Sequence, residues 1–194
     1  MVRLTTPEST TIPLHKPKLR ERLFFLMSGA IVSIPLTLFI STFSDYLFIL
    51  IPYNYIGLLS AVLLAPFIEE FSKAYPLFYR HAETERSIFV LGFLVGLGFG
   101  IVEFIEYIVI FQAPILVRLP GIFFHASTTS IIAFGISKKR SLWYYLIAVA
   151  LHMSNNLFAS LGFVWIFGGP VITALTYLLS WLFHGKTKER MIPM

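Results

Sequence analysis

Long apolar stretches, each about as long as a membrane-spanning helix, dominate this chain of 194 residues. A hydrocarbon core of about 30 Å is crossed by roughly 20 helical residues. Because backbone polar groups inside lipid must be satisfied within the chain, each stretch is predicted to be a helix. The chain is therefore predicted to be all-α, a polytopic transmembrane helical bundle with six spans. The predicted spans are residues 23–42, 54–78, 88–112, 115–137, 141–160 and 163–184.

The segment 46–52 leaves one alternative open. Apolar residues continue through 46–78, which is too long for one span, and Pro52 interrupts them. We interpret 46–52 as an interfacial segment and 54–78 as the second span. If 46–52 formed a further packed segment, the bundle would contain seven or eight helices.

The basic residues are distributed as in a membrane protein, not as in a nucleic-acid-binding protein. The chain has 15 Lys and Arg residues and a formal net charge of +5. All of them except Lys73 and Arg118 lie before the first span or after spans two, four and six, which is one side of a six-span protein. Cytoplasmic loops carry such an excess of Lys and Arg. We therefore expect a multi-pass protein of the cell membrane with both termini in the cytoplasm, and no nucleic-acid partner.

The sequence indicates one domain between two short tails. We expect residues 1–20 to form a cytoplasmic N-terminal tail, residues 21–185 a single transmembrane domain, and residues 186–194 a cytoplasmic C-terminal tail. The chain has no cysteine, which excludes disulfides and thiolate metal sites.

Ionisable and amide side chains occur inside four of the predicted spans, where hydrocarbon makes them costly and their presence indicates function. With a rise of ~1.5 Å per residue from the cytoplasmic end of each span, Glu69, His152 and His125 lie at depths of roughly 15, 17 and 18 Å, and Glu103 at about 22 Å. Groups from four helices thus reach one layer, and a bundle can enclose them in a polar pocket. The ionisable and amide residues away from the ends of these spans are Glu69, Glu70, Lys73, Glu103, Glu106, His125, His152, Asn155 and Asn156.

Helical spacing pairs some of these side chains. Lys73 follows Glu70 by three residues and Glu69 by four, so an ion pair within one helix is available. His152 and Asn156 are four residues apart and share a face.

Structural interpretations stay open for several of these positions. A histidine in a membrane helix is often only an interhelical hydrogen-bonding residue, and this applies to His125. Asn155 is interpreted as a packing residue. A row of small residues, Gly92, Gly96 and Gly100, is interpreted as a site of close helix packing that brings Glu103 towards the second span.

Four short motifs, in order and in separate spans, resemble those of the PrsW-type intramembrane proteases. Residues 69–73, Glu-Glu-Phe-Ser-Lys, resemble the EExxK motif, and residues 99–103 resemble the FxxxE motif. Residues 125–129 resemble a third, histidine-containing motif, and residues 152–156 resemble the final HxxxN motif. The resemblance covers about residues 57–160. The same superfamily includes the CAAX-prenyl endopeptidases and other CPBP membrane proteases, which carry EExxxR and FxxxH instead.

The resemblance implies hydrolysis of a peptide bond in the membrane, in a membrane protein or peptide substrate. The domain 21–185 is then a protease-like domain. Such hydrolysis needs an activated water, a stabilised oxyanion and a proton donor for the leaving amine. Glu69 is predicted to be the general base, although the choice between Glu69 and Glu70 stays open. If Glu69 is the base, Glu70 would anchor the motif helix or Lys73.

The remaining motif residues are predicted to complete this catalytic site. Glu103 would share a proton with the base or orient it. His152 and Asn156 would donate to the oxyanion, and His125 would orient the water or shuttle a proton.

Three alternatives remain at this point. Two histidines with two or three glutamates could bind zinc, as in a metal-dependent CAAX-type protease; the sequence lacks an HExxH helix, so no cofactor or metal is expected. Buried Glu and His also form the relays of proton- or ion-coupled transporters, although no internal repeat is evident. A non-catalytic membrane scaffold is the third alternative.

Overall fold

The computed structural model describes residues 16–47, 52–79, 84–162 and 165–192. The regular elements in these ranges are helices, which confirms the predicted all-α class. Five helical segments are long and apolar enough to cross a membrane, namely Leu19–Phe39, Tyr55–Tyr79, Glu85–Val109, Ile115–Ser137 and Ile166–Gly185.

The first half of the chain forms two long segments that each contain a π-helical turn. The first segment consists of α1 (Leu19–Ser28), the π turn η1 (Gly29–Ser33) and α2 (Ile34–Leu47). The second consists of α3 (Tyr53–Leu59), the π turn η2 (Ser60–Leu64), α4 (Ala65–Ala74) and the 3₁₀ turn η3 (Tyr75–Tyr79). A π turn widens the helix by one residue, and such turns occur frequently at functional sites.

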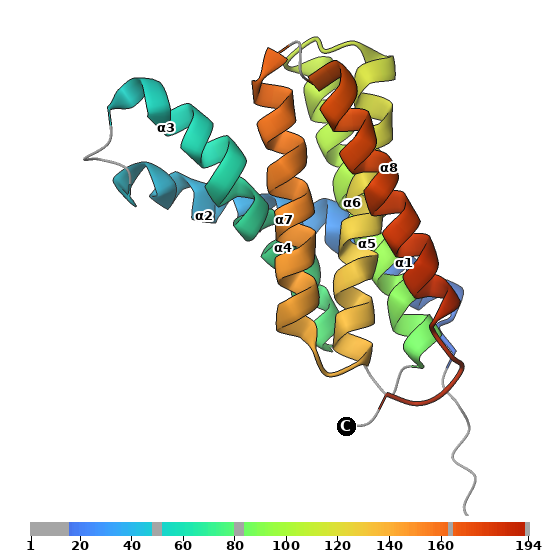
Figure 1. The fold of residues 1–194 in the computed structure, drawn as a ribbon. Helices are drawn as coiled ribbons and strands as arrows, with labels where there is room; N and C mark the ends of the chain where they lie inside the picture. The colour runs from blue at the N-terminus through green and yellow to red at the C-terminus, as the bar shows by residue number, and fades with distance from the viewer. Residues whose placement is uncertain (1–15, 48–51, 80–83, 163–164, 193–194) are drawn as a thin grey trace, which may run out of the picture.

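The second half forms four long helices that run alongside one another (Figure 1). They are α5 (Glu85–Val109), α6 (Ile115–Ser137), α7 (Ser141–Ser160) and α8 (Trp165–Gly185). The predicted spans 115–137 and 141–160 coincide with α6 and α7. With its 20 residues α7 is also long enough to cross a bilayer. Of the predicted interfacial segment 46–52, residues 48–51 lie outside the described ranges.

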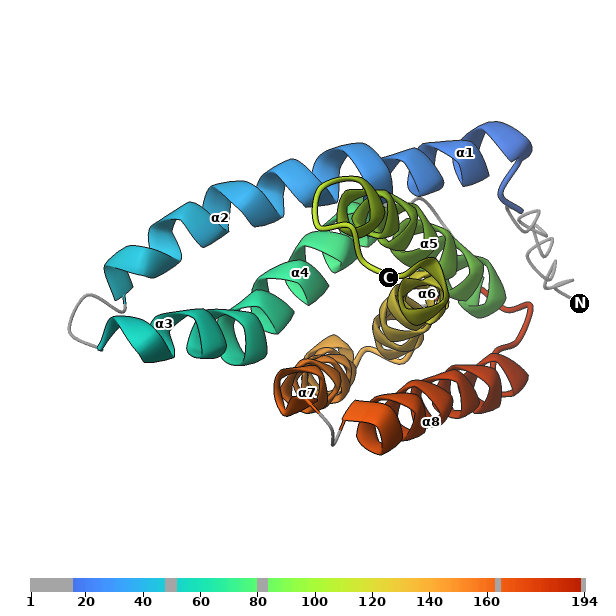
Figure 2. The same cartoon turned by 90° about the horizontal axis from the view of Figure 1, so that it is seen from above.

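The first helical segment does not run parallel to α5–α8. Seen from above, α1 and α2 extend lengthwise across the bundle, and α2 and α3 form an arm that reaches away from it (Figure 2). Two glycines permit the close crossing with α5. A Cβ on Gly98 would lie 2.0 Å from the carbonyl oxygen of Leu26, and a Cβ on Gly29 would lie 1.9 Å from that of Val95.

The predicted glycine row packs α5 against α6. A Cβ on Gly96 would lie 2.2 Å from the carbonyl oxygen of His125, and one on Gly92 would lie 2.5 Å from the Cβ of Ala133. The interpretation of this row as a packing surface is therefore confirmed, and it fixes the height of α6 against α5 at His125.

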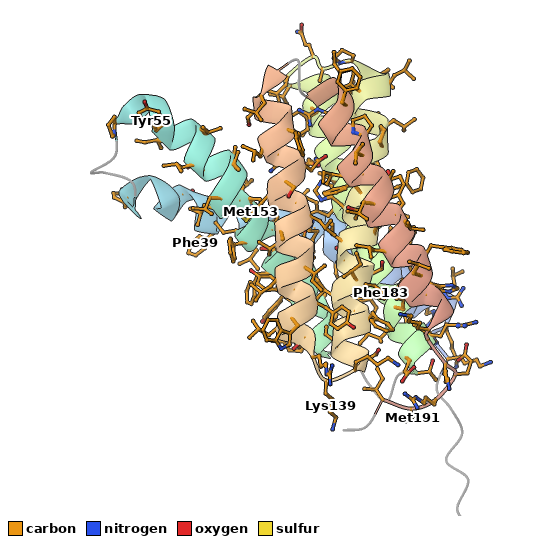
Figure 3. All side chains as sticks on the ribbon, viewed as in Figure 1. Phe39, Tyr55, Lys139, Met153, Phe183 and Met191 are labelled. Carbon is orange, nitrogen blue, oxygen red and sulfur yellow. The ribbon has the colours of Figure 1, made fainter. Side chains whose placement is uncertain are left out.

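The C-terminal segment, residues 186–192, packs against the end of the bundle at which α5 begins. Thr84 caps α5 through its side chain, which accepts from the Ser87 amide at 3.0 Å. The buried Glu85 carboxylate then contacts Arg190 Nε at 2.6 Å and Lys138 Nζ at 2.8 Å. Figure 3 places Lys139 and Met191 at this same end. Residues 186–192 thus bind to the start of α5 and do not extend away from the bundle.

Candidate functional site

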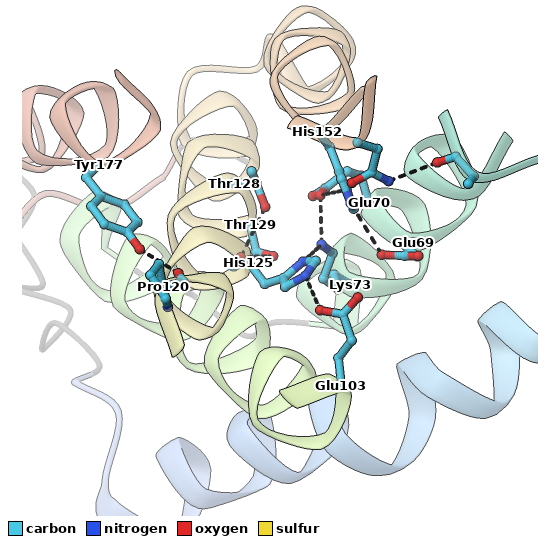
Figure 4. Close-up of polar contacts among 12 residues, drawn as sticks. Glu69, Glu70, Lys73, Glu103, Pro120, His125, Thr128, Thr129, His152 and Tyr177 are labelled. Carbon is cyan, nitrogen blue, oxygen red and sulfur yellow. Dashed lines mark hydrogen bonds and ion pairs between the residues drawn. The ribbon is translucent and has the colours of Figure 1, made fainter. Parts of the chain in front are cut away.

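Four helices carry the predicted site residues (Figure 4). α4 carries Glu69, Glu70 and Lys73, while α5 and α6 carry one member each and α7 carries two. The members from these three helices are Glu103, His125, His152 and Asn156. The convergence that the depth calculation predicted is thus present in the structure.

Lys73 connects the α4 motif to the histidine of α6. Its ammonium nitrogen lies 2.7 Å from Glu70 Oε1 and 2.8 Å from His125 Nδ1, and it sits 4.8 Å from the ring centre of Phe99. Lys73 and Glu70 are fully buried. Since an ammonium group only donates, Nδ1 of His125 accepts, and the ring proton of a neutral His125 lies on Nε2.

The Nε2–H of His125 therefore points at α5. Nε2 lies 2.6 Å from Glu103 Oε2, a short, charge-assisted hydrogen bond. Glu103 is the most accessible carboxylate of the cluster, with 24% of its side chain exposed, whereas the His125 side chain is 4% exposed. A chain of contacts thus runs from Glu70 through Lys73 and His125 to Glu103.

Glu70 also sets the orientation of the histidine on α7. His152 Nδ1 lies 2.9 Å from Glu70 Oε1, and a carboxylate only accepts, so Nδ1 carries the proton of a neutral His152. Nε2 of this ring then presents a lone pair. It faces Glu69 Oε2 at 3.7 Å, which is longer than a hydrogen bond.

The carboxylate of Glu69 differs from the others in its pairing. Its Oε2 is buried and has no hydrogen-bond partner among the described residues; Oε2 of Glu70 is also buried and unpartnered, but Glu70 Oε1 is bonded to Lys73 and His152. An unpaired buried carboxylate oxygen facing an imidazole lone pair is an arrangement in which a water molecule or a cation can bridge the two. Glu70 differs from Glu69 in that its Oε1 contacts both Lys73 and His152.

Three of these residues also form a candidate metal set. One ligand atom each of Glu69, His125 and His152 lies within 4.8 Å of the others. Two histidines and one glutamate are a set known from catalytic zinc sites. Glu69 and His152 fit an ion as they stand, and the contact of His152 with Glu70 matches the carboxylate that commonly supports a metal-bound histidine. Both ring nitrogens of His125 already have partners, so it fits less directly.

The charge of the cluster also fits a cation. With neutral histidines, the carboxylates of Glu69, Glu70 and Glu103 face a single ammonium group, that of Lys73. A net negative charge inside a membrane protein is unfavourable unless a bound cation or added protons compensate it.

Asn156 lies one turn beyond His152 and has a different partner. Its Nδ2 donates to the carbonyl oxygen of Ala61 at 2.9 Å, within the π turn η2. The second N–H of the amide is not used by this bond. Asn156 therefore ties α7 to η2, next to the glutamate-bearing helix.

Sequence reasoning missed two features of the site. The ring of Phe124 stands edge-on to both histidines, with centroids 5.7 Å from His125 and 5.6 Å from His152. Its place beside His125 in the sequence was the available signal. The acceptor at Ala61 has no signal in the sequence, because every residue carries a backbone carbonyl.

Fold and site together define a class, a multi-pass membrane protein with a buried centre of glutamates and histidines. The chain belongs more specifically to the PrsW family of intramembrane metalloproteases, whose family model matches residues 18–184. Members of this family are described as membrane-embedded proteases, which agrees with the resemblance of the four motifs. No match was found among curated proteins or among solved structures.

Proposed function

We propose that this protein is an endopeptidase that hydrolyses a peptide bond of a membrane-associated protein, with a water molecule activated by Glu69. The observation that carries the proposal is the buried, unpaired Oε2 of Glu69 facing Nε2 of His152 at 3.7 Å. The wider kinship with CAAX-prenyl endopeptidases stays a prediction from the motifs.

In this mechanism the water lies between Glu69 and His152. Glu69 removes one proton as the water oxygen attacks the peptide carbonyl, and the lone pair of His152 Nε2 holds the second hydrogen. When the tetrahedral intermediate collapses, the C–N bond breaks and Glu69 returns its proton to the leaving amine. One water is consumed, and one carboxyl and one amine end are formed.

The neutral His152 is thereby assigned to holding the water, because its only N–H is bound to Glu70. We assign donation to the oxyanion to Asn156, through its second amide N–H, and to His125, through the Nε2–H that otherwise bonds Glu103. Such donors contribute roughly 3–4 kcal/mol each to transition-state stabilisation. His125 would give up its hydrogen bond to Glu103 during that exchange.

As a second form of the site, we propose that Glu69, His152 and His125 would hold a divalent metal ion of the zinc type. These residues would then serve as ligands in place of the base, acceptor and donor roles assigned above. When bound, such an ion supplies Lewis-acid activation of water and of the carbonyl. The family description as metalloprotease and the negative charge of the cluster support this, in contrast to the expectation of no cofactor drawn from the sequence.

The metal proposal is tested on the purified protein by counting bound zinc after dialysis. We expect about one ion per chain, with binding at least about tenfold weaker in Glu69→Gln and in His152→Ala. Glu106→Gln, on the same helix as Glu103, serves as the control and should bind as the unaltered protein does. A zinc content at background level, together with cleavage that resists chelators, would contradict the metal proposal and retain the mechanism in which Glu69 activates the water.

The distribution of charge supports a topology as well. Arg86 contacts Thr187 of the C-terminal segment, and Lys139 lies at the same end of the bundle as Met191 (Figure 3). We propose that this basic end faces the cytoplasm.

The proposed function is tested in cells that lack the protein and are supplied with single variants. We expect a membrane protein to accumulate uncut with Glu69→Gln and with His152→Ala, and to be cut with Glu106→Gln. Quantitative proteomics of membrane fractions measures this and names the substrate. Proton flux without any change in membrane-protein cleavage would replace the protease assignment by a transporter.

A further inference from the structure

A cavity of about 690 Å³ lies between α6, α7 and α8, in the half of the bundle opposite the C-terminal segment. Figure 2 shows how the three helices stand around this region. Residues of its wall include Leu116, Gly121, Phe124, Asn155, Asn156 and Tyr177. The proposed reaction does not use this cavity as such, although Asn156 belongs to both.

The cavity adjoins the catalytic centre through one side chain. Phe124 lines it and also stands edge-on to His125 and His152, at 5.7 and 5.6 Å between ring centroids. Asn155 and Asn156 follow His152 by three and four residues, so they lie on the same side of α7, and both line the cavity. Phe124 thus connects the wall of the cavity to the two histidines of the site.

The wall combines apolar surface with groups that pair with a peptide backbone. The two asparagine amides both donate and accept hydrogen bonds. Pro120 has no backbone N–H, so the carbonyl oxygen of Leu116 lacks the hydrogen bond that it would otherwise accept within the helix. The carbonyl of Pro120 in turn accepts from Tyr177 Oη at 2.5 Å, which ties α8 to this wall. A lipid acyl chain cannot form hydrogen bonds with these polar groups, whereas the backbone N–H and C=O groups of an extended peptide segment can.

Gly121 lines the cavity and has open space where a side chain would stand. A Cβ at this position would meet no atom within 4 Å, in contrast to the tightly packed Gly96. A side chain at position 121 would therefore fill the cavity without displacing its walls.

We propose that this cavity is a specificity subsite that takes a bulky apolar side chain of the substrate, next to the scissile bond. The inference rests on the proposed function and extends it to the substrate class. Phe124 forms the wall towards the catalytic centre, Asn155 pairs with the substrate backbone, and Gly121 provides the depth.

The test uses purified, reconstituted protein and a cleavable membrane substrate with Ala, Leu or Phe at each position flanking the cut. We expect the unaltered protein to prefer Leu or Phe at one position. Gly121→Leu should lower kcat/KM for that substrate at least about tenfold while the Ala substrate changes less than about twofold, since mismatched apolar groups discriminate on this scale. Gly57→Leu is the control, because Gly57 on α3 also faces open space. Equal losses on all substrates, or an equal loss in Gly57→Leu, would overturn the subsite.

A binding measurement separates failure of the subsite from failure of the protease assignment. A photo-crosslinking residue at Ala174, which lines the cavity, is placed in the inactive Glu69→Gln protein with the intact substrate. We expect a crosslink to the substrate that Gly121→Leu abolishes. Crosslinks to lipid alone would overturn the subsite, whereas a substrate crosslink without cleavage by the unaltered protein would retain the subsite and remove the proposed reaction.

Discussion

At the residue scale, Lys73 is the group on which the two halves of the site depend. Its ammonium is shared between Glu70 and His125, and Glu70 in turn orients His152. A buried carboxylate and a buried ammonium offset the unfavourable transfer of each from water, so neither is easily replaced alone. Two histidines on different helices thus have their proton positions set by one ion pair of α4.

Replacing Lys73 by methionine tests this dependence. The change leaves Glu70 with an uncompensated charge, and removing one partner of a buried pair typically destabilises by about 3–5 kcal/mol. We expect a large drop in the thermal unfolding temperature in detergent and loss of cleavage. Lys139→Met, at an exposed position near the end of the bundle, is the control and should leave both nearly unchanged. A Lys73→Met protein as stable and as active as the unaltered one would show that the ion pair does not organise the site.

Sequence reasoning reached part of this arrangement. Depth along each span predicted that Glu69, Glu103, His125 and His152 share a layer, because the rise of a helix is constant. Spacing left Lys73 either Glu69 or Glu70 as a partner on the same helix, and the structure pairs it with Glu70. The contact of Lys73 with His125 was out of reach, because it depends on how two helices are rotated against each other.

At the scale of elements, the crossing of α5 and α6 determines where His125 stands. Gly96 lies against the backbone of His125, so the distance between the two helices there is set by a residue without a side chain. The sequence predicted that the glycine row packs and that 115–137 is one helix. It did not predict the π turns η1 and η2, because apolar composition is the same for α and π turns, nor the arm formed by α2 and α3.

Gly96→Ala tests the crossing with a single methyl group. Its Cβ would lie 2.2 Å from the His125 carbonyl oxygen, so α6 must shift. Overpacking of this kind destabilises by about 1–3 kcal/mol, and the shift falls on the proposed oxyanion donor His125, so cleavage should decrease more than stability alone explains. The matched control is Gly57→Ala, which meets no neighbour and should be neutral or slightly stabilising. Equal unfolding temperatures and rates in both variants would contradict a crossing set by Gly96.

At the scale of the whole molecule, the C-terminal segment holds together the end of the bundle near the termini. Glu85 at the start of α5 contacts Lys138 after α6 and Arg190 in the segment, and its Oε2 also accepts from the Lys188 amide at 3.1 Å. Ile192 is buried in the same apolar cluster as Leu77. The segment predicted from sequence as a tail thus packs as part of the bundle.

Glu85→Gln should release this segment. Glutamine keeps the shape but loses both ion pairs, so the basic sites at Lys186, Lys188 and Arg190 become better trypsin substrates. Limited proteolysis of C-terminally tagged protein in sealed vesicles measures the rate of tag loss, and we expect it to rise several-fold. Glu106→Gln should digest at the original rate. An unchanged rate in Glu85→Gln would mean that the ion pairs do not hold the segment.

The central claim is that Glu69 activates the water that cleaves the substrate. It is tested most directly by the single-turnover cleavage rate of purified protein in vesicles, with the unaltered chain, Glu69→Gln and Glu106→Gln compared at equal folded concentration. The account predicts a rate lower by at least about 10² for Glu69→Gln, the scale of a lost general base, and an unchanged rate for Glu106→Gln. Cleavage by Glu69→Gln at the unaltered rate would contradict it.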